Sequence, residues 1–171
     1  MEKLDLCEAI KNHKVPFVLN PAQEWENFPR HIQSIISRDD WHEIKYFIDS
    51  TTELNPQVND IPNDCGGIYS FIIKPEIISG YHLYIAYIGR ARSTINQNLR
   101  KRVKEYQTDD RLKIQALKKY WGPFLYVRYI PLKGETNATI DEIEKALNKA
   151  ILPPFNDQYP DVYNQPMRAA F

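Results

Sequence analysis

Two β-rich runs in the middle of the 171-residue chain, residues 67–73 and 81–89, leave few folds open to it. Both runs are dominated by β-branched and aromatic residues, which pack well on a pleated sheet. Only residues 74–80 separate them, so they predict an antiparallel hairpin. Strict alternation along the second run would place Ile85 and Tyr87 together on one face of that hairpin.

The residues that follow predict the rest of a small α/β (α+β) domain. Apolar periodicity and bounding glycines or prolines indicate, in order, a helix, a second helix, a strand and a last helix. Together with the hairpin, this order predicts a three-stranded antiparallel sheet flanked by helices. The expected segments are helices over 96–107 and 110–120, a strand over 124–130 and a helix over 138–151.

The front third of the chain reads as mainly helical. Residues 22–37 have helix-like apolar spacing, although Pro29 interrupts them, and residues 40–48 predict a second short helix capped by an aspartate. Residues 55–64 are rich in turn formers, which indicates a boundary. We therefore expect a helical N-terminal extension over 1–62, the α/β domain over 63–157 and a tail over 158–171.

Composition places the chain among globular proteins. Hydrophobic residues make up 43% and aromatic residues 12%, which is enough for a core and excludes bulk disorder. No apolar run is long enough to span a membrane, and the first residues precede no stretch typical of a secretory signal. Cys7 and Cys65 make neither a disulfide framework nor a metal knuckle. These features predict a soluble cytoplasmic protein with no membrane partner.

Charge is balanced over the whole chain but not along it. The 22 basic and 22 acidic side chains cancel, which taken alone argues against a nucleic-acid binder. Residues 1–66 hold 6 basic and 12 acidic side chains, whereas residues 90–120 hold 10 basic and 3 acidic ones. The basic block is either a solvated helix face or a surface that contacts phosphates.

Glu144 stands where the helical pattern expects an apolar residue. At 100° per residue it falls inside the stripe formed by Ile140, Ile143 and Leu147. A glutamate in such a stripe either lies at its edge, where it reaches solvent or pairs with a core arginine, or is aimed at a site as a metal ligand or general base.

Arg102 lies at the margin of a similar stripe, formed by Leu99, Val103 and Tyr106. It either covers apolar surface with its stem or leans over the same sheet face as Tyr106. The hairpin is also rich in tyrosine. Tyrosine is a good strand former, and its phenol can hydrogen-bond a water or a phosphate.

The hairpin resembles that of the GIY-YIG endonuclease domain. Gly67-Ile68-Tyr69 on the first strand and Tyr87-Ile88-Gly89 on the second stand in the order of the family motif. Each tripeptide alone is common, whereas the two in order on paired strands are specific. The resemblance covers residues 66–157. The 13 positions from Gly89 to Arg102 exceed the spacing of compact members and predict a longer loop.

Other residues are similar to the remaining positions of the family pattern. Arg102 followed by Tyr106 resembles the arginine and the tyrosine or histidine of the family's first helix. Glu144 and Asn156 match its metal-binding glutamate and its closing asparagine, with a 12-residue step like that of UvrC repair nucleases. Arg90 occupies the position of a basic residue in UvrC-like members.

The resemblance implies a metal-dependent DNA endonuclease that hydrolyses phosphodiester bonds with Mg²⁺, or with Mn²⁺. It makes Glu144 the only side chain that binds the ion, which suits magnesium because this ion keeps most of its waters. It makes Tyr69 the general base, assisted by Arg90, and Arg102 the residue that holds the scissile phosphate. It makes Tyr87 and Tyr106 the residues that hydrogen-bond the water or the phosphate. It makes Asn156 a residue that supports the site from outside.

Within this family, a type II restriction endonuclease or a related defence nuclease fits such a chain best. A symmetric DNA target would require two active sites and hence a homodimer. The alternatives are a structure-specific or nonspecific single-strand nuclease and a nucleic-acid-binding module that does not cleave. Contacts with the DNA backbone are expected from Arg92, Arg100, Lys101 and Lys104.

Overall fold

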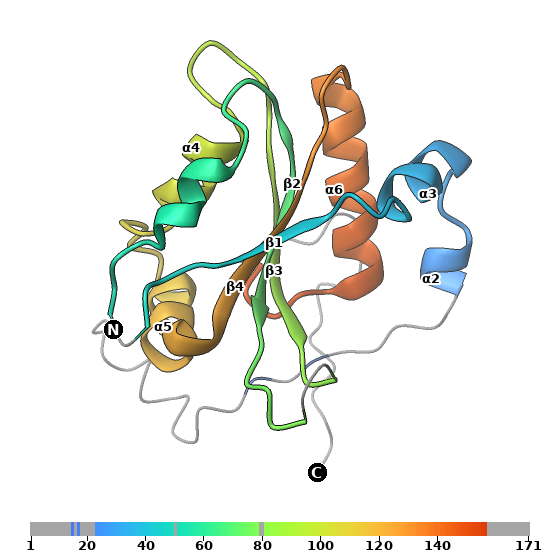
Figure 1. The fold of residues 1–171 in the computed structure, drawn as a ribbon. Coiled ribbons are helices and arrows are strands. Elements are labelled where there is room, and N and C mark those ends of the chain that lie inside the picture. The colour runs from blue at the N-terminus through green and yellow to red at the C-terminus, as the bar shows by residue number, and fades with distance from the viewer. Residues whose placement is uncertain (1–14, 16, 18–22, 50, 79–80, 157–171) are drawn as a thin grey trace.

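The protein folds around one four-stranded antiparallel sheet with helices on both faces (Figure 1). The computed structural model describes residues 15, 17, 23–49, 51–78 and 81–156. The strand order is β1-β4-β2-β3, so β4 and β2 are central and β1 and β3 are the edges. The strands are β1 (His42–Lys45), β2 (Gly67–Ile73), β3 (Tyr84–Ala91) and β4 (Leu125–Pro131).

The predicted hairpin is confirmed, with a β-bulge that changes which side chains share a face. β2 and β3 pair directly, but Phe71 lies opposite Tyr87 while the next residue, Ile72, lies opposite Ile85. The extra residue is Ala86, and such an insertion shifts the alternation of the strand by one. Ile85 therefore packs on one face of the sheet and Tyr87 on the other, so strict alternation was wrong here.

The helix predicted over 40–48 is wrong, because this segment forms the edge strand β1. Its four residues pair antiparallel with β4, His42 opposite Tyr129 and Lys45 opposite Tyr126. The imidazole of His42 stacks on the ring of Tyr129, with their centroids 5.2 Å apart. β4 offers unpaired backbone N–H and carbonyl groups along one edge, and pairing with them stabilises residues 42–45 in the extended form. This pairing outweighs the weak local preference of the segment for helix. The sheet thus has four strands rather than the predicted three.

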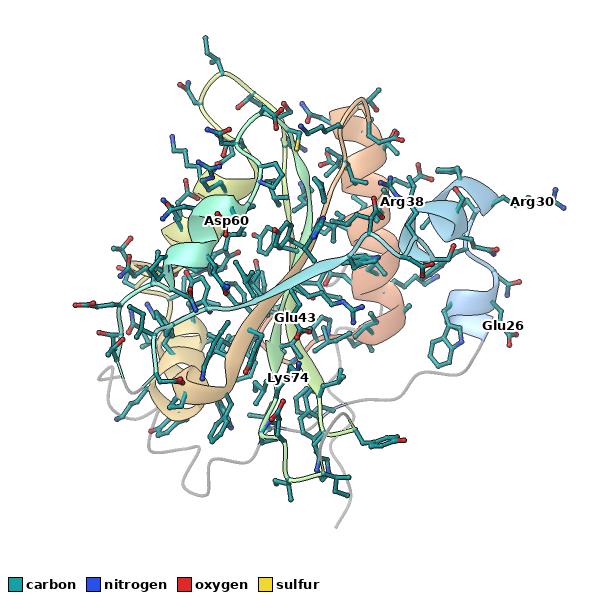
Figure 2. All side chains as sticks on the ribbon, viewed as in Figure 1. Glu26, Arg30, Arg38, Glu43, Asp60 and Lys74 are labelled. Carbon is teal, nitrogen blue, oxygen red and sulfur yellow. The ribbon has the colours of Figure 1, made fainter. Side chains whose placement is uncertain are left out.

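Further residues that the sequence assigned to the N-terminal extension also belong to the sheet and its core. The 3₁₀ helix η1 (Pro56–Asp60) follows β1, and Val58 and Ile61 are fully buried in the core. Lys74, just after β2, donates to the carboxylate of Glu43 on β1 at 2.6 Å (Figure 2). The turn-rich segment 55–64 is therefore packed against the domain.

The front helix is split where Pro29 interrupts the pattern. α2 covers Gln23–Glu26 and α3 covers Arg30–Ile36, which begins directly after the proline. Proline has no N–H and fits only the first turn of a helix, so it ends one helix and permits the next.

The sheet separates two apolar cores (Figure 1). On one face lie α4 (Leu99–Glu105) and α5 (Leu112–Trp121), and on the other face α6 (Asn137–Ile151) packs with α3. Thr136 is the N-cap of α6, and its hydroxyl accepts from the N–H of Thr139 at 3.1 Å. The predicted order of elements from residue 67 is confirmed.

Some predicted features fall on residues outside the described part of the chain. They are the tail over 158–171 and the N-terminal extension before Gln23, apart from Val15 and Phe17. Among the described residues, no helix is both long and apolar enough to cross a membrane.

Candidate active site

Three tyrosine hydroxyls meet in a buried chain of hydrogen bonds on the α4/α5 face of the sheet. Tyr69 comes from β2, Tyr87 from β3 and Tyr106 from the C-terminal end of α4. The hydroxyls of Tyr69 and Tyr106 are 2.8 Å apart, and Tyr106 donates to Tyr87 at 2.8 Å. Because Tyr106 gives its single hydroxyl hydrogen to Tyr87, Tyr69 must be the donor in the first bond. The chain therefore runs in one direction, from Tyr69 through Tyr106 to Tyr87.

Gly89 makes room for this chain on β3. A Cβ atom at Gly89 would lie 2.6 Å from Cζ of Tyr69 and 2.9 Å from Cε1 of Tyr87. Real Cβ atoms do not approach other atoms so closely. The glycine therefore lets the ring of Tyr69 lie across the neighbouring strand, where its hydroxyl reaches Tyr106.

Two arginines flank the tyrosine chain. Cζ of Arg102 lies 5.4 Å from the ring centroid of Tyr106, and Arg102 is held by Glu105 at 2.8 Å. Cζ of Arg111 lies 5.5 Å from the centroid of the same ring. Guanidinium groups at this distance are attracted to the faces of aromatic rings. We call Tyr69, Tyr87, Tyr106, Arg102 and Arg111 the tyrosine cluster.

Two hydroxyls of the tyrosine cluster, those of Tyr69 and Tyr106, are held in their neutral form. Burial raises the pKa of Tyr69 well above its ordinary value of 10.0, and the nearby phenols of Tyr106 and Tyr87 act in the same direction. Burial likewise raises the pKa of Tyr106, whereas the positive charge of Arg102 opposes the shift at both residues. A buried phenolate costs more than a solvated one, so these residues favour hydrogen bonding over proton abstraction in this arrangement.

A second group of charged residues joins β3 to α6, the helix on the opposite face of the sheet. Arg90 forms ion pairs with both Glu144 and Asp141. Arg92 donates to the two oxygens of Asp141 at 3.0 and 2.5 Å. We call these four residues the carboxylate cluster. Within the described residues, no hydrogen bond or ion pair connects it to the tyrosine cluster.

The two carboxyl groups of this cluster differ in their surroundings. The side chain of Glu144 is only 16% exposed, and burial raises its pKa although Arg90 acts in the opposite direction. The hydrogen bond from Arg92 lowers the pKa of Asp141. Both carboxylates are thus engaged by arginine, and Glu144 is the more costly of the two to hold in its charged form.

Asn156 lies at the outer edge of β3. Its side-chain oxygen accepts from the N–H of Ile88 at 2.9 Å, and its side-chain amide donates to the carbonyl of Ile88 at 2.7 Å. Phe155 adds a backbone bond, donating from its N–H to the carbonyl of the bulge residue Ala86 at 3.0 Å. These bonds give hydrogen-bond partners to backbone groups on the outer edge of β3, next to Gly89.

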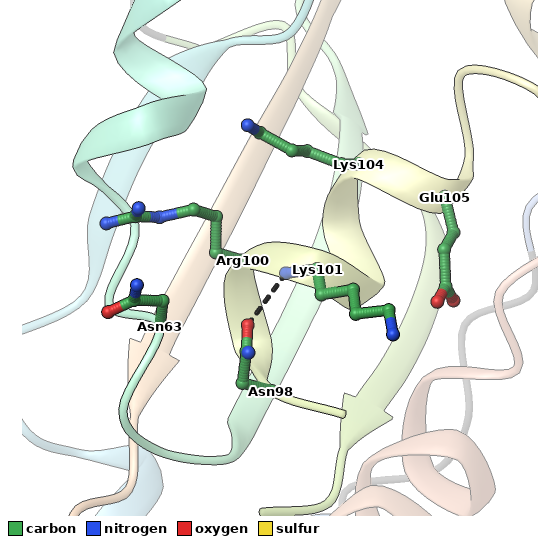
Figure 3. Close-up of a pocket in the computed structure, with 6 residues that line it drawn as sticks. All are labelled: Asn63, Asn98, Arg100, Lys101, Lys104 and Glu105. Atoms are coloured by element: carbon green, nitrogen blue, oxygen red, sulfur yellow. Dashed lines mark hydrogen bonds between the residues drawn. The ribbon is translucent and has the colours of Figure 1, made fainter. Parts of the chain in front are cut away.

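A basic surface hollow lies between η1 and α4 (Figure 3). Its three cations are held by neutral oxygens: Arg100 by the carbonyl of Ile61 at 2.5 Å, Lys101 by the carbonyl of Asn96 and Lys104 by the side chain of Asn59. Neutral acceptors fix the positions of these groups without cancelling their charge. The hollow is lined by Asn63, Asn98, Arg100, Lys101, Lys104 and Glu105.

The structure brings some of the predicted site residues together and separates others. Tyr69, Tyr87, Arg102 and Tyr106 form one cluster, whereas Arg90 and Glu144 pair on the other face. Asn156 contacts β3 rather than either cluster. Of the residues predicted to contact DNA, Arg100, Lys101 and Lys104 line the hollow, and Arg92 is paired with Asp141.

Two residues near these clusters were not predicted. At 100° per residue Asp141 falls outside the apolar stripe of α6, toward solvent, but it is only 21% exposed and pairs with both Arg90 and Arg92. Its position one turn before Glu144 was the available signal. Arg111 lies within the helix predicted over 110–120, but in the structure it is the N-cap residue before α5, so helical periodicity gave no direction for its side chain.

The carboxylate cluster has the donor chemistry that a magnesium ion prefers. Glu144 and Asp141 offer hard carboxylate oxygens on adjacent turns of α6. Among the described residues no three His, Cys, Asp or Glu side chains gather into a metal-binding group. The residues therefore fit an ion that takes one protein ligand, Glu144, and the rest of its shell from water and phosphate, provided that Arg90 releases that carboxylate.

Comparisons with protein-family models, with curated proteins and with solved structures found no match to this chain.

Proposed function

We propose that the protein is a Mg²⁺-dependent endonuclease that hydrolyses phosphodiester bonds in DNA. The observation that carries the proposal is the meeting of Tyr69, Tyr87, Arg102 and Tyr106. They come from three separate segments, and the GIY-YIG resemblance assigns all four to the catalytic site. A common role is the simplest reason for them to share one buried hydrogen-bond chain.

Arg102 is the residue that binds the scissile phosphate in this proposal. Its side chain is 35% exposed, so part of the guanidinium faces solvent while Glu105 fixes the rest. Arginine can present two parallel N–H donors to one phosphate, which positions the group and stabilises the charge that develops on it. Tyr87 is the outermost phenol of the chain, so it is the tyrosine that contacts the substrate.

Tyr69 is the general base that the resemblance assigns, but its hydroxyl is fully buried and bonded to Tyr106. A water molecule cannot reach it in this arrangement. In this arrangement Tyr69 keeps its proton and donates it to Tyr106, so its contribution is to orient the chain rather than to take a proton from water. The same chain fixes the orientation of Tyr87.

Glu144 would hold the Mg²⁺ ion, which when bound would polarise the phosphate and lower the pKa of a coordinated water. In this structure Arg90 is paired with Glu144. A substrate phosphate offers Arg90 another anionic partner, so DNA binding and release of Glu144 are coupled in the proposed mechanism.

Among DNA nucleases, we propose a restriction enzyme or a related defence nuclease, acting as a dimer where its target is symmetric. A structure-specific or single-strand nuclease would use the same site. The basic hollow supplies backbone contacts in either case, because Arg100, Lys101 and Lys104 donate to neutral oxygens, which do not cancel their charge.

A nucleic-acid-binding module without cleavage is the second candidate, and two observations favour it. Tyr69 is fully buried, and Arg90 occupies the carboxylate of Glu144. If neither arrangement changes when DNA binds, the site holds a phosphate but activates no water.

The deciding experiment incubates the purified protein with plasmid, single-stranded DNA and RNA in Mg²⁺ and sequences the product ends. Discrete fragments with a common motif indicate a restriction enzyme, whereas a smear indicates a nonspecific nuclease. A retarded gel band without products supports the binding module.

The matched variants are Glu144→Ala and Glu142→Ala, two positions apart on α6. Glu142 is exposed and pairs with His31 at 3.1 Å, away from the cluster. We expect Glu144→Ala to lose cleavage by at least about 10²-fold while DNA binding survives, and Glu142→Ala to cleave normally. Full cleavage by Glu144→Ala protein would reject the assignment of the ion.

A further inference from the structure

One face of α6 carries a polar side chain on each of its successive turns. At 100° per residue these side chains fall within a sector of about 60°, so they lie on the same side of the helix. We call this face the polar stripe of α6, and its members are Asn137, Asp141, Glu144 and Asn148.

The first three members of the polar stripe have partners on β3 or directly after it. The side chain of Asn137 bonds both the N–H and the carbonyl of Ser93, at 2.9 and 3.1 Å. The carboxylates of Asp141 and Glu144 both pair with Arg90. The stripe therefore lies beside β3 and includes both carboxylates of the carboxylate cluster.

Asn148, the last member of the stripe, is buried without a partner for its side-chain oxygen. The residue is only 3% exposed, and within the described residues no group donates to its Oδ1. A buried oxygen without a hydrogen bond costs about 1–3 kcal/mol, which is why native proteins give nearly all such groups a partner. An apolar side chain of similar size would carry no such cost at this position. The amide oxygen therefore calls for a ligand.

The position of Asn148 on the helix directs this oxygen toward Glu144. Residues four apart on a helix have Cβ atoms about 5–6 Å from each other. Because Cα–Cβ bonds tilt toward the N-terminus of a helix, the side chain of Asn148 leans over the turn that carries Glu144. Glu144 is the carboxylate to which the proposed function assigns the Mg²⁺ ion. Magnesium keeps several of its waters when a protein binds it, so acceptors beside its protein ligand receive hydrogen bonds from those waters.

We propose that Asn148 accepts a hydrogen bond from a water of the ion that Glu144 holds. The proposal rests on the proposed function and adds a positioning residue that the sequence motif does not contain. A bound cation makes its waters stronger donors, which suits an acceptor that has no other partner. A neutral amide also adds no negative charge beside Asp141 and Glu144.

A purely structural role for Asn148 predicts a different effect on stability. In that case its oxygen would bind an ordinary buried water that stabilises the fold, and Asn148→Leu would lower the free energy of unfolding. In our proposal the oxygen gains its partner only with the ion. We therefore expect metal-free Asn148→Leu protein to be at least as stable as the wild type in urea, because it loses a buried group without a bond. A less stable Asn148→Leu protein with unchanged ion affinity would overturn the proposal.

The ion affinity is measured with Mn²⁺ alone, from the EPR signal of the free ion and without DNA. Both the wild type and Arg90→Gln are titrated, because Arg90→Gln removes the arginine that pairs with Glu144. Asn148→Leu should weaken Mn²⁺ binding by about 10–100-fold, the usual effect of losing a group that supports a metal site from outside its ligands. Failure of both backgrounds to bind Mn²⁺ would overturn the proposal, as would equal affinities with and without Asn148→Leu.

Three further variants distinguish the proposed contact from a general disturbance of α6. Asn148→Asp keeps an oxygen acceptor and should bind Mn²⁺ at least as tightly as the wild type. Asn137→Leu, on the same stripe, should leave the affinity unchanged because Ser93 already bonds that side chain. In Glu144→Ala protein, Asn148→Leu should have no additional effect, since the two residues act on one ion. An equal loss with and without Glu144 would mean that Asn148 serves a different site. If Asn148→Leu does not fold, Asn148→Ala replaces it, and an unchanged Mn²⁺ affinity in that variant overturns the proposal.

The same measurements separate this inference from the proposed function. Mn²⁺ binding that depends on Glu144 and Asn148, in a protein that cleaves neither DNA nor RNA, would support the ion site and reject the nuclease. Cleavage of DNA by a protein whose Mn²⁺ affinity does not depend on Asn148 would support the nuclease and overturn the inference.

Discussion

Gly89 is the residue on which the geometry of the tyrosine cluster depends most directly. Its missing side chain is the space that the ring of Tyr69 occupies. We expect Gly89→Ala to displace that ring, to lower the free energy of unfolding by about 1–3 kcal/mol, and to reduce cleavage. Urea unfolding checks the stability and the cleavage assay above checks the site.

Gly122→Ala is the matched control for this substitution. A Cβ atom at Gly122 would meet only Cδ2 of Phe47, at an ordinary 3.8 Å, and the backbone there is helical. Its stability should change by less than about 0.5 kcal/mol. If both variants lost a similar free energy of unfolding, the cost would come from replacing any glycine by alanine and not from filling the space over β3.

Buried tyrosines also predict how stability depends on pH. The pKa values of Tyr69 and Tyr106 are raised above the ordinary 10.0 by burial, so the unfolded chain loses these protons first. Their contribution is fully present below about pH 10 and is lost as pH rises toward the folded-state values. Urea midpoints between about pH 8 and pH 11 should therefore fall, and fall less steeply in Tyr106→Phe. A Tyr106→Phe profile parallel to that of the wild type would contradict this.

At the residue scale, the sequence predicted which side chains are unusual but not what they contact. The apolar stripe of α6 singled out Glu144, and the structure supplies the arginine partner that one of its two interpretations expected. The partner, Arg90, is 54 positions away on a strand. Arg111 carried no signal, because its direction is set by Asp109 and by rings that only the folded chain brings near.

Among the elements, β3 is an edge strand whose outer side is bonded by the side-chain amide of Asn156 and by the backbone N–H of Phe155. Asn156 imitates a neighbouring strand by bonding both the N–H and the carbonyl of Ile88. Asn156→Ala should leave these groups buried without partners, which costs about 1–3 kcal/mol of unfolding free energy. Thermal or urea unfolding measures the loss.

Asn137 offers a close comparison, because it makes the same pair of bonds with the backbone of Ser93 at 2.9 and 3.1 Å. That pair is exposed, so water replaces the lost bonds in Asn137→Ala and the cost should be smaller. Equal losses in the two variants would indicate that covering the edge of β3 contributes nothing beyond an ordinary surface bond.

Local sequence predicted the elements that have strong periodicity of their own. α6 and the hairpin were confirmed because an apolar stripe and two β-rich runs are local properties. β1 was missed because its four residues become a strand only by pairing with β4, more than 80 positions later. The bulge at Ala86 was missed for a similar reason, since the carbonyl of that residue is bonded by Phe155.

Over the whole molecule, balanced charge conceals two kinds of cation. Arg90, Arg92, Arg102 and Arg111 are each paired with a carboxylate. The three cations of the basic hollow are held by neutral oxygens. Some basic residues over 90–120 are thus paired directly with carboxylates, and others donate to neutral oxygens, which the count along the sequence could not predict.

Nucleic-acid binding should therefore depend on where charge is removed rather than on how much. A triple variant of Arg100, Lys101 and Lys104 to glutamine should lower the salt slope of DNA binding by about 2.7, or 0.9 for each phosphate contact. A control triple of Arg38, Lys45 and Lys133 to glutamine removes the same charge, but from cations already paired with Asp40, Asp49 and Asp64. Its slope should stay within about 0.9 of the wild-type value, whereas equal losses in the two triples would assign binding to net charge and not to the hollow.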